Sequence, residues 1–387
     1  MRYRYRFYPT PPQVRELARV FGCARYAYNW ALRTRTDAYR GGRTLNYYSC
    51  SAEWTKHRKS AGKEWLRETS CIPQQQSLRH LQTAYKNFFE KRVAYPRFKR
   101  KHGSQSAEYT RSGFKWDPAN RNLNLSGVGR LDAHWSRPFA SRPSTVTITK
   151  DCAGRYFVTL CLDEKVIALP KTGEAVGIDL GVSRLATLST GERIPNPKHL
   201  GENLAELRRL QRAFARKRKG SGRRERQRVR IARLQAHIAD SRKDYLDKVT
   251  TSLVQRFDVL AIEDLNVRGM MANHCLARAI GDVGMSAFRR MLEYKCKWYG
   301  KELKLVDRFF PSSKRCHVCG FVSESLPLSV REWDCPECNS HHDRDENAAR
   351  NILTAGHAVT AQGGTTRRSK ASALKCKSRR TVNQPAL

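Results

Sequence analysis

Two Cys-x-x-Cys pairs constrain the fold of this chain more than any other feature. Cys316 and Cys319 form the first pair, and Cys335 and Cys338 follow after fifteen intervening residues. Two tight turns at this separation can hold four thiolates tetrahedrally around one zinc ion, as in a zinc ribbon. Because four thiolates complete the coordination shell, we expect a structural zinc without a reactive water. The alternative is two unrelated redox pairs, which the spacing and the flanking Gly320 disfavour.

The remaining cysteines and the neighbouring histidines carry no comparable signal. Twelve cysteines without a secretory signal are typical of reduced thiols and metal ligands rather than disulfides. The first residues alternate basic and aromatic side chains and lack the apolar segment of a signal peptide, so we expect a cytoplasmic protein. His341 and His342 follow the second pair, but the shell is already full, so we interpret them as ordinary polar residues.

The charge balance predicts a polyanionic partner. The chain has 74 Lys and Arg against 35 Asp and Glu, a formal net charge of +39. A compact body with that charge repels itself unless a polyanion neutralises it. Nucleic acid is the obvious polyanion, because each phosphate that the protein neutralises releases a condensed counterion and so favours binding. A membrane-surface protein is the competing interpretation, but the sequence offers neither an amphipathic anchor nor an apolar span. We therefore expect a nucleic-acid-binding protein.

The N-terminal half predicts a small β domain interrupted by helices. Residues 1–8 alternate as a strand does, and helical periodicity follows Pro11-Pro12 and recurs over 74–91. Short alternating runs at 122–125, 145–149 and 156–162 then predict strands of a barrel or sandwich. The N-terminal strand would pair with them, which makes the helices an insertion.

The C-terminal half predicts a mixed α/β domain. Its expected strands are 175–180, 185–189 and 257–265. Its expected helices are 200–218, 223–256, 276–300 and 346–354. The last 30 or so residues have the composition of a disordered basic tail.

Three acidic positions are candidates for a catalytic metal site. Asp179 and Glu263 each end an apolar strand, and Asp343 and Asp345 stand where the final helix begins. A carboxylate at the end of a core strand is costly unless a partner or a metal compensates its charge. Asp179, Glu263 and Asp345 could converge on two Mg²⁺ ions that clamp a phosphodiester. Strand-end charges and a helix cap are the alternative; Asp264 is the second choice beside Glu263.

The two basic helices predict a surface that follows phosphates. Between Arg208 and Arg233 the chain has thirteen Arg or Lys and one acid, Glu225. A merely solvated face would gain from mixed charges at i,i+4 and loses from like charges, so we favour nucleic-acid binding over that alternative. The candidate residues are Arg216, Lys217, Arg218, Lys219, Arg223 and Arg224.

The order of these motifs resembles the TnpB family, RNA-guided DNA endonucleases encoded by transposons and related to the type V CRISPR effectors. The resemblance is carried by GIDLG at 177–181, IEDL at 262–265, PSSK at 311–314 leading into the first cysteine pair, and DRDENAARNI at 343–352. RFYPT at 6–10, RYAYNW at 25–30 and PRFK at 96–99 add to it. It covers about residues 1–355.

The resemblance implies a multidomain α/β fold. The expected parts are a wedge β-barrel, similar to an oligonucleotide-binding fold, at 1–10 and 104–170, a helical recognition insertion at 11–103, an RNase H-like (RuvC) nuclease domain at 171–310 and 343–356, a zinc ribbon at 311–342, and the tail at 357–387. It also implies that Asp179, Glu263 and Asp345 form a RuvC-type catalytic triad, with Asp343 as the alternative third acid.

The resemblance further implies the partners and the reaction, which is Mg²⁺-dependent hydrolysis of phosphodiester bonds in the target DNA. The partners would be a guide RNA from the element's own end and double-stranded target DNA, with no membrane, and the protein a monomer or weak dimer. Base pairing would read the target, and the protein only a short flanking motif. Gln75, Gln76 and Ser77 have the polar chemistry for base edges, although residues at a helix start usually have no such role. The competing functions are a strand-transfer transposase, a nuclease-inactive repressor and a structural ribbon protein.

Overall fold

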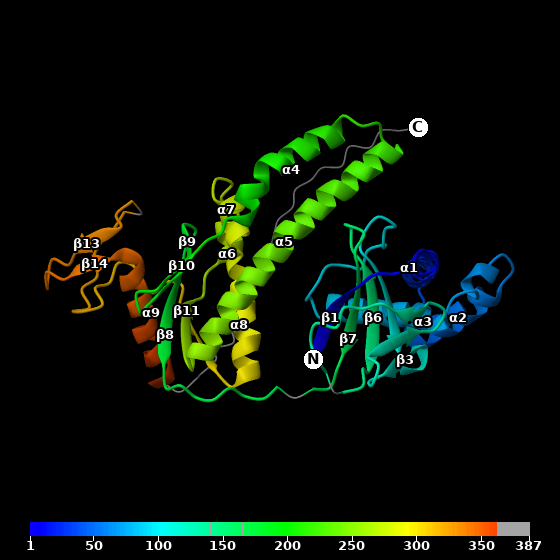
Figure 1. The fold of residues 1–387 in the computed structure, drawn as a ribbon, viewed down its shortest axis with the longest axis horizontal. Coiled ribbons are helices and arrows are strands. Elements are labelled where there is room, and N and C mark those ends of the chain that lie inside the picture. Colours follow the sequence, from blue (N-terminus) through cyan, green and yellow to red (C-terminus); the bar gives the residue numbers. More distant parts are fainter. Residues whose placement is uncertain (140, 165, 328, 362–387) are drawn as a thin grey trace. The chain divides into compact units, whose positions relative to one another are not determined.

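The structure is a computed structural model that describes residues 1–139, 141–164, 166–327 and 329–361. The chain divides into two compact units. The first comprises Met1–Ile167 with His199–Lys243, and the second comprises Ala168–Lys198 with the described residues from Asp244 onward. Figure 1 shows that each unit combines helices and strands, as expected for a mixed α/β protein. Within the described ranges, no helix has the length and apolar character needed to cross a membrane.

The first unit is built on two antiparallel sheets that share one core. The larger sheet has the order β1-β7-β6-β2, and its strands are β1 (Arg2–Phe7), β7 (Tyr156–Cys161), β6 (Thr145–Lys150) and β2 (Gln105–Thr110). The smaller sheet is β3 (Phe114–Asp117), β4 (Asn122–Leu125) and β5 (Gly129–Leu131). The pairing of β1 with β7 joins the two ends of this β domain in the sequence, as the alternating pattern predicts. Alternate residues of both sheets point into the common core, among them Phe7, Leu123 and Val158.

Three helices lie between β1 and β2 in the sequence. They are α1 (Pro11–Arg40), α2 (Tyr47–Lys59) and α3 (Cys71–Phe89), and a short 3₁₀ helix, η1 (Glu64–Leu66), precedes α3. Thr10 caps α1 in a capping box with Gln13. The sequence interpretation missed α2, because Cys50 and Trp54 are its only buried residues and so give no helical period. A second 3₁₀ helix, η2 (Arg111–Gly113), precedes β3.

The two basic helices form as predicted, with shifted ends. They are α4 (His199–Ala215) and α5 (Gly222–Arg256). The sequence extends α4 to 218, but it ends at Ala215, after which Arg216–Ser221 form the turn between the helices. The first unit includes α4 and the part of α5 up to Lys243, and the rest of α5 belongs to the second unit.

The second unit is built on one mixed sheet of five strands. Its order is β10-β9-β8-β11-β12, with β10 (Arg193–Pro195), β9 (Arg184–Leu188), β8 (Ala175–Leu180), β11 (Val259–Glu263) and β12 (Glu302–Val306). The pairs β8–β11 and β11–β12 are parallel, whereas β8–β9 and β9–β10 are antiparallel. The sequence interpretation missed β10 and β12. The first has only three residues, and the second is mostly half-exposed, so neither has a clear apolar pattern.

Helices cover both faces of this sheet. On one face, Leu246, Leu253 and Phe288 from α5 and α8 (Met285–Tyr299) pack against the strands. On the other face lies α9 (Arg344–Ala361), whose Ile352 packs on Ala261 and Val306. In Figure 1, α9 and the pair α5 and α8 flank β8 and β11 from opposite sides. A short α6 (Val267–Met270) precedes α7 (Ala277–Val283).

Two helix predictions in this unit are wrong in extent. The helix expected over 276–300 is broken into α7 and α8 at Gly284, whose φ of +76° is left-handed and ends α7. The final helix, expected over 346–354, runs from Arg344 to Ala361 and so includes residues 357–361, which the sequence assigns to the tail. The rest of that predicted tail, 362–387, lies outside the described residues.

Candidate active site and metal centre

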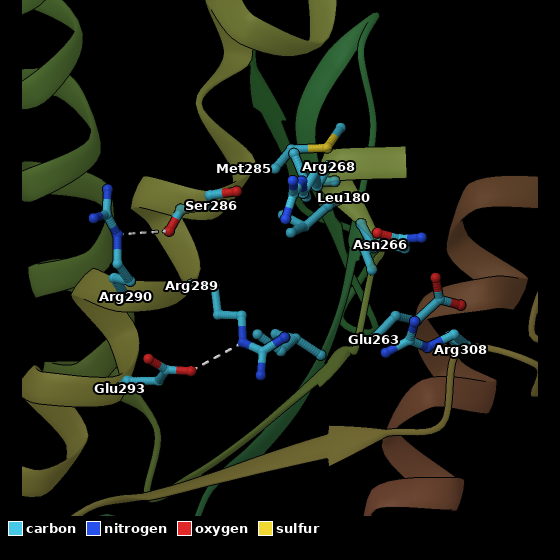
Figure 2. Close-up of a pocket in the computed structure, with 13 residues that line it drawn as sticks. Leu180, Glu263, Asn266, Arg268, Met285, Ser286, Arg289, Arg290, Glu293 and Arg308 are labelled. Carbon is cyan, nitrogen blue, oxygen red and sulfur yellow. Dashed lines mark hydrogen bonds and ion pairs between the residues drawn. The ribbon is translucent and has the colours of Figure 1, made fainter. Parts of the chain in front are cut away.

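The register of the parallel strands places Asp179 and Glu263 on neighbouring strands at the same level. In β8 and β11, Ile178 pairs with Ile262, so the next residues along the two strands are Asp179 and Glu263. Both strands run in the same direction, and their carboxyl ends therefore meet at one edge of the sheet. Figure 2 shows Glu263 where β11 ends. Local hydrophobic patterning makes the two strands, and the pairing register brings their terminal acids together.

A close helix–sheet contact brings the third acid to the same edge. A Cβ at Gly177 would lie 2.0 Å from the Ala349 carbonyl oxygen of α9, and one at Gly356 would lie 2.6 Å from Ala261 Cβ. Only glycine allows backbones to approach this closely. Gly177 and Asp179 share a face of β8 by strand alternation, so α9 lies over the face that carries Asp179. Asp345 stands in the first turn of α9.

The charges of the three acids are coupled. Burial raises the pKa of Asp179 to about 7, and the negative charges of Glu263 and Asp345 contribute to this rise. Burial also raises the pKa of Glu263, which a hydrogen bond from the Ser312 hydroxyl opposes. Such shifts are characteristic of functional sites, where like charges are held together at a cost in stability. The three acids thus form one electrostatic cluster.

The cluster is more open than a single-ion cage. Among the described residues, the four cysteines are the only group of three or more candidate ligands whose ligand atoms all lie within 4.8 Å of one another. The three carboxylates are therefore spaced more widely. A site for two divalent ions about 3.5–4 Å apart needs such spacing, because its ligands are distributed over both ions.

Asp343 and Asp345 have different roles in the structure. One oxygen of Asp343 accepts hydrogen bonds of 3.0 Å from the backbone N–H groups of Asp345 and Glu346, which makes Asp343 the N-cap of α9. Its other oxygen lies 2.8 Å from Arg193. The Asp345 carboxylate lies instead 3.6 Å from Arg331 and 4.0 Å from Arg184. The charges of both acids raise the pKa of Asp179, and Asp345 contributes more than Asp343.

Asp264 is directed away from the cluster, as strand alternation implies. Its carboxylate forms ion pairs with Arg289 and, at 2.7 Å, with Arg308, and these arginines hold its pKa below the usual range. A carboxylate neutralised by two guanidinium groups is a poor candidate for a metal ligand. The sequence interpretation missed both arginines, since nothing in their spacing links them to Asp264.

A cavity of about 310 Å³ borders Glu263. Figure 2 shows four arginines around it: Arg268, Arg289, Arg290 and Arg308. Arg289 and Arg308 bind Asp264, whereas Arg290 donates to the backbone carbonyl of Ser286. The cavity is therefore lined by four arginines and two glutamates, Glu263 and Glu293, and Glu263 belongs to the acidic cluster.

The four cysteines converge as the sequence predicts. Cys316 Sγ lies 3.6 Å from Cys338 Sγ, and Cys319 Sγ lies 3.5 Å from Cys335 Sγ. A tetrahedral zinc with bonds of about 2.3 Å needs sulfur–sulfur separations of about 3.8 Å, so the cluster fits this ion with little adjustment. The strands β13 (Glu332–Asp334) and β14 (His341–Asp343) form the hairpin around the second pair. The Ser340 hydroxyl lowers the pKa of Cys338 to about 6, which favours its thiolate.

His342 takes part in this centre, contrary to the interpretation of an ordinary polar residue. It is 2% exposed, and its Nε2 lies 3.1 Å from Cys316 Sγ. An imidazole N–H directed at a metal-bound thiolate would orient that ligand and offset part of its charge. His341, in contrast, is exposed and pairs with Asp334.

The basic helix hairpin divides its candidate residues between two roles. Arg224 donates to the carbonyls of Phe214 and Lys217, at 3.1 and 2.7 Å, and stacks over the Phe214 ring. It therefore caps the end of α4 and holds the turn. Lys217 is half-buried. The candidates that are exposed are Arg216, Arg218, Lys219 and Arg223.

The polar residues at the start of α3 are mostly internal. Gln76 is 8% exposed and Ser77 is 4% exposed, and the Ser77 hydroxyl donates to the Pro73 carbonyl. Gln75 is partly exposed and accepts a hydrogen bond from Ser51. Of the three, Gln75 has the most accessible side chain.

Three family models match separate parts of the chain. They are the IS605 OrfB model described as "Probable transposase" over 159–274, a "Cas12f1-like, TNB domain" over 286–352, and an IS605 OrfB helix-turn-helix domain over 1–44. The fold is similar to the protein in a cryo-EM structure of a Cas12f1–sgRNA–target DNA complex, with a TM-score of 0.55 at 13% identity over 87% of this chain and 81% of that one.

Curated relatives extend over almost the whole chain. A "Putative RNA-guided DNA endonuclease" of Streptomyces pristinaespiralis is 50% identical over 366 residues, which cover 93% of this chain and 90% of the relative. One of Escherichia coli is 34% identical, and the match covers 93% of both chains. The fold and the matched regions define the class, which comprises transposon-encoded proteins of the IS605 type and their CRISPR-associated relatives. Within that class, the chain belongs to the TnpB family.

Proposed function

We propose that this protein is an RNA-guided, Mg²⁺-dependent DNA endonuclease of a transposable element, which cuts target DNA next to a short flanking motif. The single observation that carries this proposal is geometric: the β8–β11 register and the close approach of α9 bring Asp179, Glu263 and Asp345 to one edge of the five-stranded sheet. A protein gains no stability by assembling three like charges there. Divalent cations that bind phosphodiesters would compensate them.

The strand order and the position of the acids support a RuvC-type, RNase H-like domain in the second unit. When bound, two Mg²⁺ ions would supply Lewis-acid stabilisation of the attacking and leaving oxygens of an in-line displacement. Asp179, Glu263 and Asp345 would hold these ions. Because the pKa of Asp179 is about 7, this carboxyl would give up a proton as the ions bind at neutral pH.

The cavity beside Glu263 is the proposed seat for the DNA strand at the catalytic edge. Arg268 and Arg290 line it and form no ion pair with an acid among the described residues. Their guanidinium groups can bind phosphate oxygens on either side of the scissile bond. The acids and arginines would thus separate two tasks, metal binding and backbone positioning.

The four cysteines are the proposed site of one structural zinc ion. Their sulfur separations and the absence of a free coordination position support structure rather than catalysis. The exposed cations of the α4–α5 turn would bind the phosphates of the guide RNA or of the guide–target duplex, without reading sequence. Gln75 is the most accessible of the residues proposed for the flanking motif.

The test is cleavage of a plasmid library with randomised flanks, by protein expressed together with its own downstream genomic region. We expect cutting that requires Mg²⁺ and RNA and that is lost with EDTA, with ribonuclease or in Asp179→Ala. The sequences of the cut plasmids would also reveal the flanking motif. Cutting that persists in Asp179→Ala would refute the assignment of the site.

Two other outcomes would favour the alternative functions. Guide-dependent binding without cutting under any divalent ion would indicate a nuclease-inactive repressor. One similarity supports that alternative. A stretch of 139 residues is 27% identical to a "CRISPR-associated DNA-binding protein Cas12m" of Allomeiothermus silvanus, and the match covers 34% of this chain and 26% of the relative. Joining of a cut 3′ end to a second DNA would indicate strand transfer, the activity of a transposase.

A further inference from the structure

The segment leading into the first cysteine pair touches both elements that carry the acidic cluster. Ser312 is buried, and its hydroxyl donates a hydrogen bond to Glu263 Oε1 at the end of β11. Its carbonyl accepts a hydrogen bond of 2.9 Å from Asn351 of α9. One residue four positions before a proposed zinc ligand therefore links β11 to α9.

Two buried asparagines of α9 extend this link to the cysteine turn. Asn347 and Asn351 are 2% and 3% exposed, and both donate to the Arg315 carbonyl, at 2.7 and 2.6 Å. The side-chain amide oxygen (Oδ1) of Asn347 in turn accepts a 3.0 Å hydrogen bond from the backbone N–H of His317. His317 lies between Cys316 and Cys319. Every one of these bonds joins α9 to the backbone of the turn that presents the first two thiolates.

These contacts link the geometry of the four cysteines to that of the acidic cluster. Asn347 lies two residues after Asp345 on the same helix, and Ser312 holds one oxygen of Glu263. Buried asparagine amides need their partners, since an unsatisfied polar group in the interior is costly. If the cysteine turn loosened, the carbonyls of Ser312 and Arg315 would move, and both Glu263 and the start of α9 would lose a support.

We propose that Ser312, Asn347 and Asn351 are positioning residues that couple zinc occupancy at the four cysteines to divalent-ion affinity at the three acids. This inference rests on the proposed function, because it assumes that the acids bind metal. Coupling of two binding sites is reciprocal, so each ion strengthens the binding of the other by the same factor. The ribbon then acts on catalysis through the two elements it holds, without touching the substrate.

The first experiment measures Mn²⁺ binding, as a probe for Mg²⁺, by calorimetry on the full chain loaded with zinc. Replacing a residue that orients a metal ligand typically costs about 10–100-fold in affinity, so we expect Ser312→Ala to weaken Mn²⁺ binding about tenfold. Ser312→Thr keeps the hydroxyl and should restore most of the affinity. Ser313→Ala is the matched control, since its hydroxyl makes none of these contacts. Equal affinity of Ser312→Ala and wild type would overturn the inference.

The second experiment tests the reciprocal effect. Zinc affinity is measured at equilibrium, by competition with a chromogenic chelator, with and without saturating Mg²⁺. We expect Mg²⁺ to tighten zinc binding about fivefold in wild type and Ser313→Ala, and to have no effect in Ser312→Ala. The zinc content of Ser312→Ala should match that of wild type, which loss of the folded ribbon would not predict. Equal zinc affinity of wild type with and without Mg²⁺ would refute the coupling.

The two proposals fail differently. If wild type binds Mn²⁺ and Asp179→Ala does not, the acidic site stands, whatever the Ser312 variants show. If wild type and Asp179→Ala bind Mn²⁺ equally, the proposed catalytic site itself is wrong, and the coupling is wrong with it.

Discussion

At the residue scale, the acidic cluster lowers the stability of the folded state at neutral pH. Asp179 has an ordinary pKa of 3.8 in the unfolded chain and a pKa of about 7 in the folded chain without metal. The folded state therefore holds an extra proton between these values, and its stability falls as the pH rises from about 4 to about 7. A divalent ion would remove this penalty, because it compensates the charge that the fold leaves uncompensated.

The variant Asp179→Asn should expose this penalty. At pH 8 without divalent ions, we expect it to be more stable than wild type by about 1–3 kcal/mol, because the amide carries no charge. At pH 4 the two proteins should unfold at similar temperatures. Added Mg²⁺ should stabilise wild type alone. Calorimetry over this pH range is the measurement. Equal unfolding temperatures at pH 8 would show that the charge of Asp179 does not destabilise the fold.

Asp343 and Asp345 provide a second test at the same scale. Asparagine caps a helix as well as aspartate does, so Asp343→Asn should keep α9 intact and retain cleavage within about threefold of wild type. Asp345→Asn should reduce cleavage by about a hundredfold or more without loss of stability, because it removes a proposed metal ligand. Single-turnover cleavage rates would check both. The reverse order would make Asp343 the third catalytic acid.

At the element scale, α9 is the part that completes the site. Its contact with β8 depends on the missing side chain of Gly177, and its N-terminus carries Asp345. The pairing of β8 with β11 supplies the other two acids. Three elements distant in sequence therefore build one cluster, and each is held by packing rather than by contact with a ligand.

Gly177→Ala should separate α9 from the sheet. The new Cβ would overlap the Ala349 carbonyl, which is backbone and cannot move without the helix, so we expect a loss of about 3 kcal/mol in stability. Cleavage should fall with it, since Asp345 moves with α9. Gly222→Ala is the control, because a Cβ there meets no atom within 4 Å. Thermal unfolding and cleavage rates are the readouts, and an unaffected Gly177→Ala would disprove the close contact.

At the scale of the whole molecule, a net charge of +39 makes binding to nucleic acid depend steeply on salt. The α4–α5 turn has four exposed cations whose side chains form no part of the helix caps: Arg216, Arg218, Lys219 and Arg223. Arg224 differs from them, since it caps α4 and stacks on Phe214. Charge and architecture can therefore be altered separately in the same turn.

A fourfold variant would measure the contribution of this turn. The substitutions are Arg216→Gln, Arg218→Gln, Lys219→Gln and Arg223→Gln. For duplex DNA, the slope of log K against log salt should become shallower by about 0.9 for each phosphate that the variant no longer neutralises. Lys248→Gln, which removes an exposed cation of α5 paired with Asp244, should leave the slope unchanged. Fluorescence anisotropy at several salt concentrations is the measurement, and an unchanged slope in the fourfold variant would identify a merely solvated surface.

The amino-acid sequence by itself determined the parts of this protein that depend on local pattern. The cysteine turns, the apolar strands that end in Asp179 and Glu263, and the basic helices follow from spacing and periodicity. The family was also evident from its motifs. Elements with weak patterns were missed: α2 buries two side chains, β10 is short, and β12 is half-exposed.

Only the tertiary structure decided how these parts meet. The β8–β11 register sets Asp179 beside Glu263, and the Gly177 contact brings α9 to them. The fold also made Asp343 the helix cap, turned His342 toward Cys316 and tied Ser312 to Glu263. The physical reason is that such contacts join residues far apart in the chain, whose approach depends on packing and on satisfying buried polar groups. Spacing along the sequence carries no measure of either.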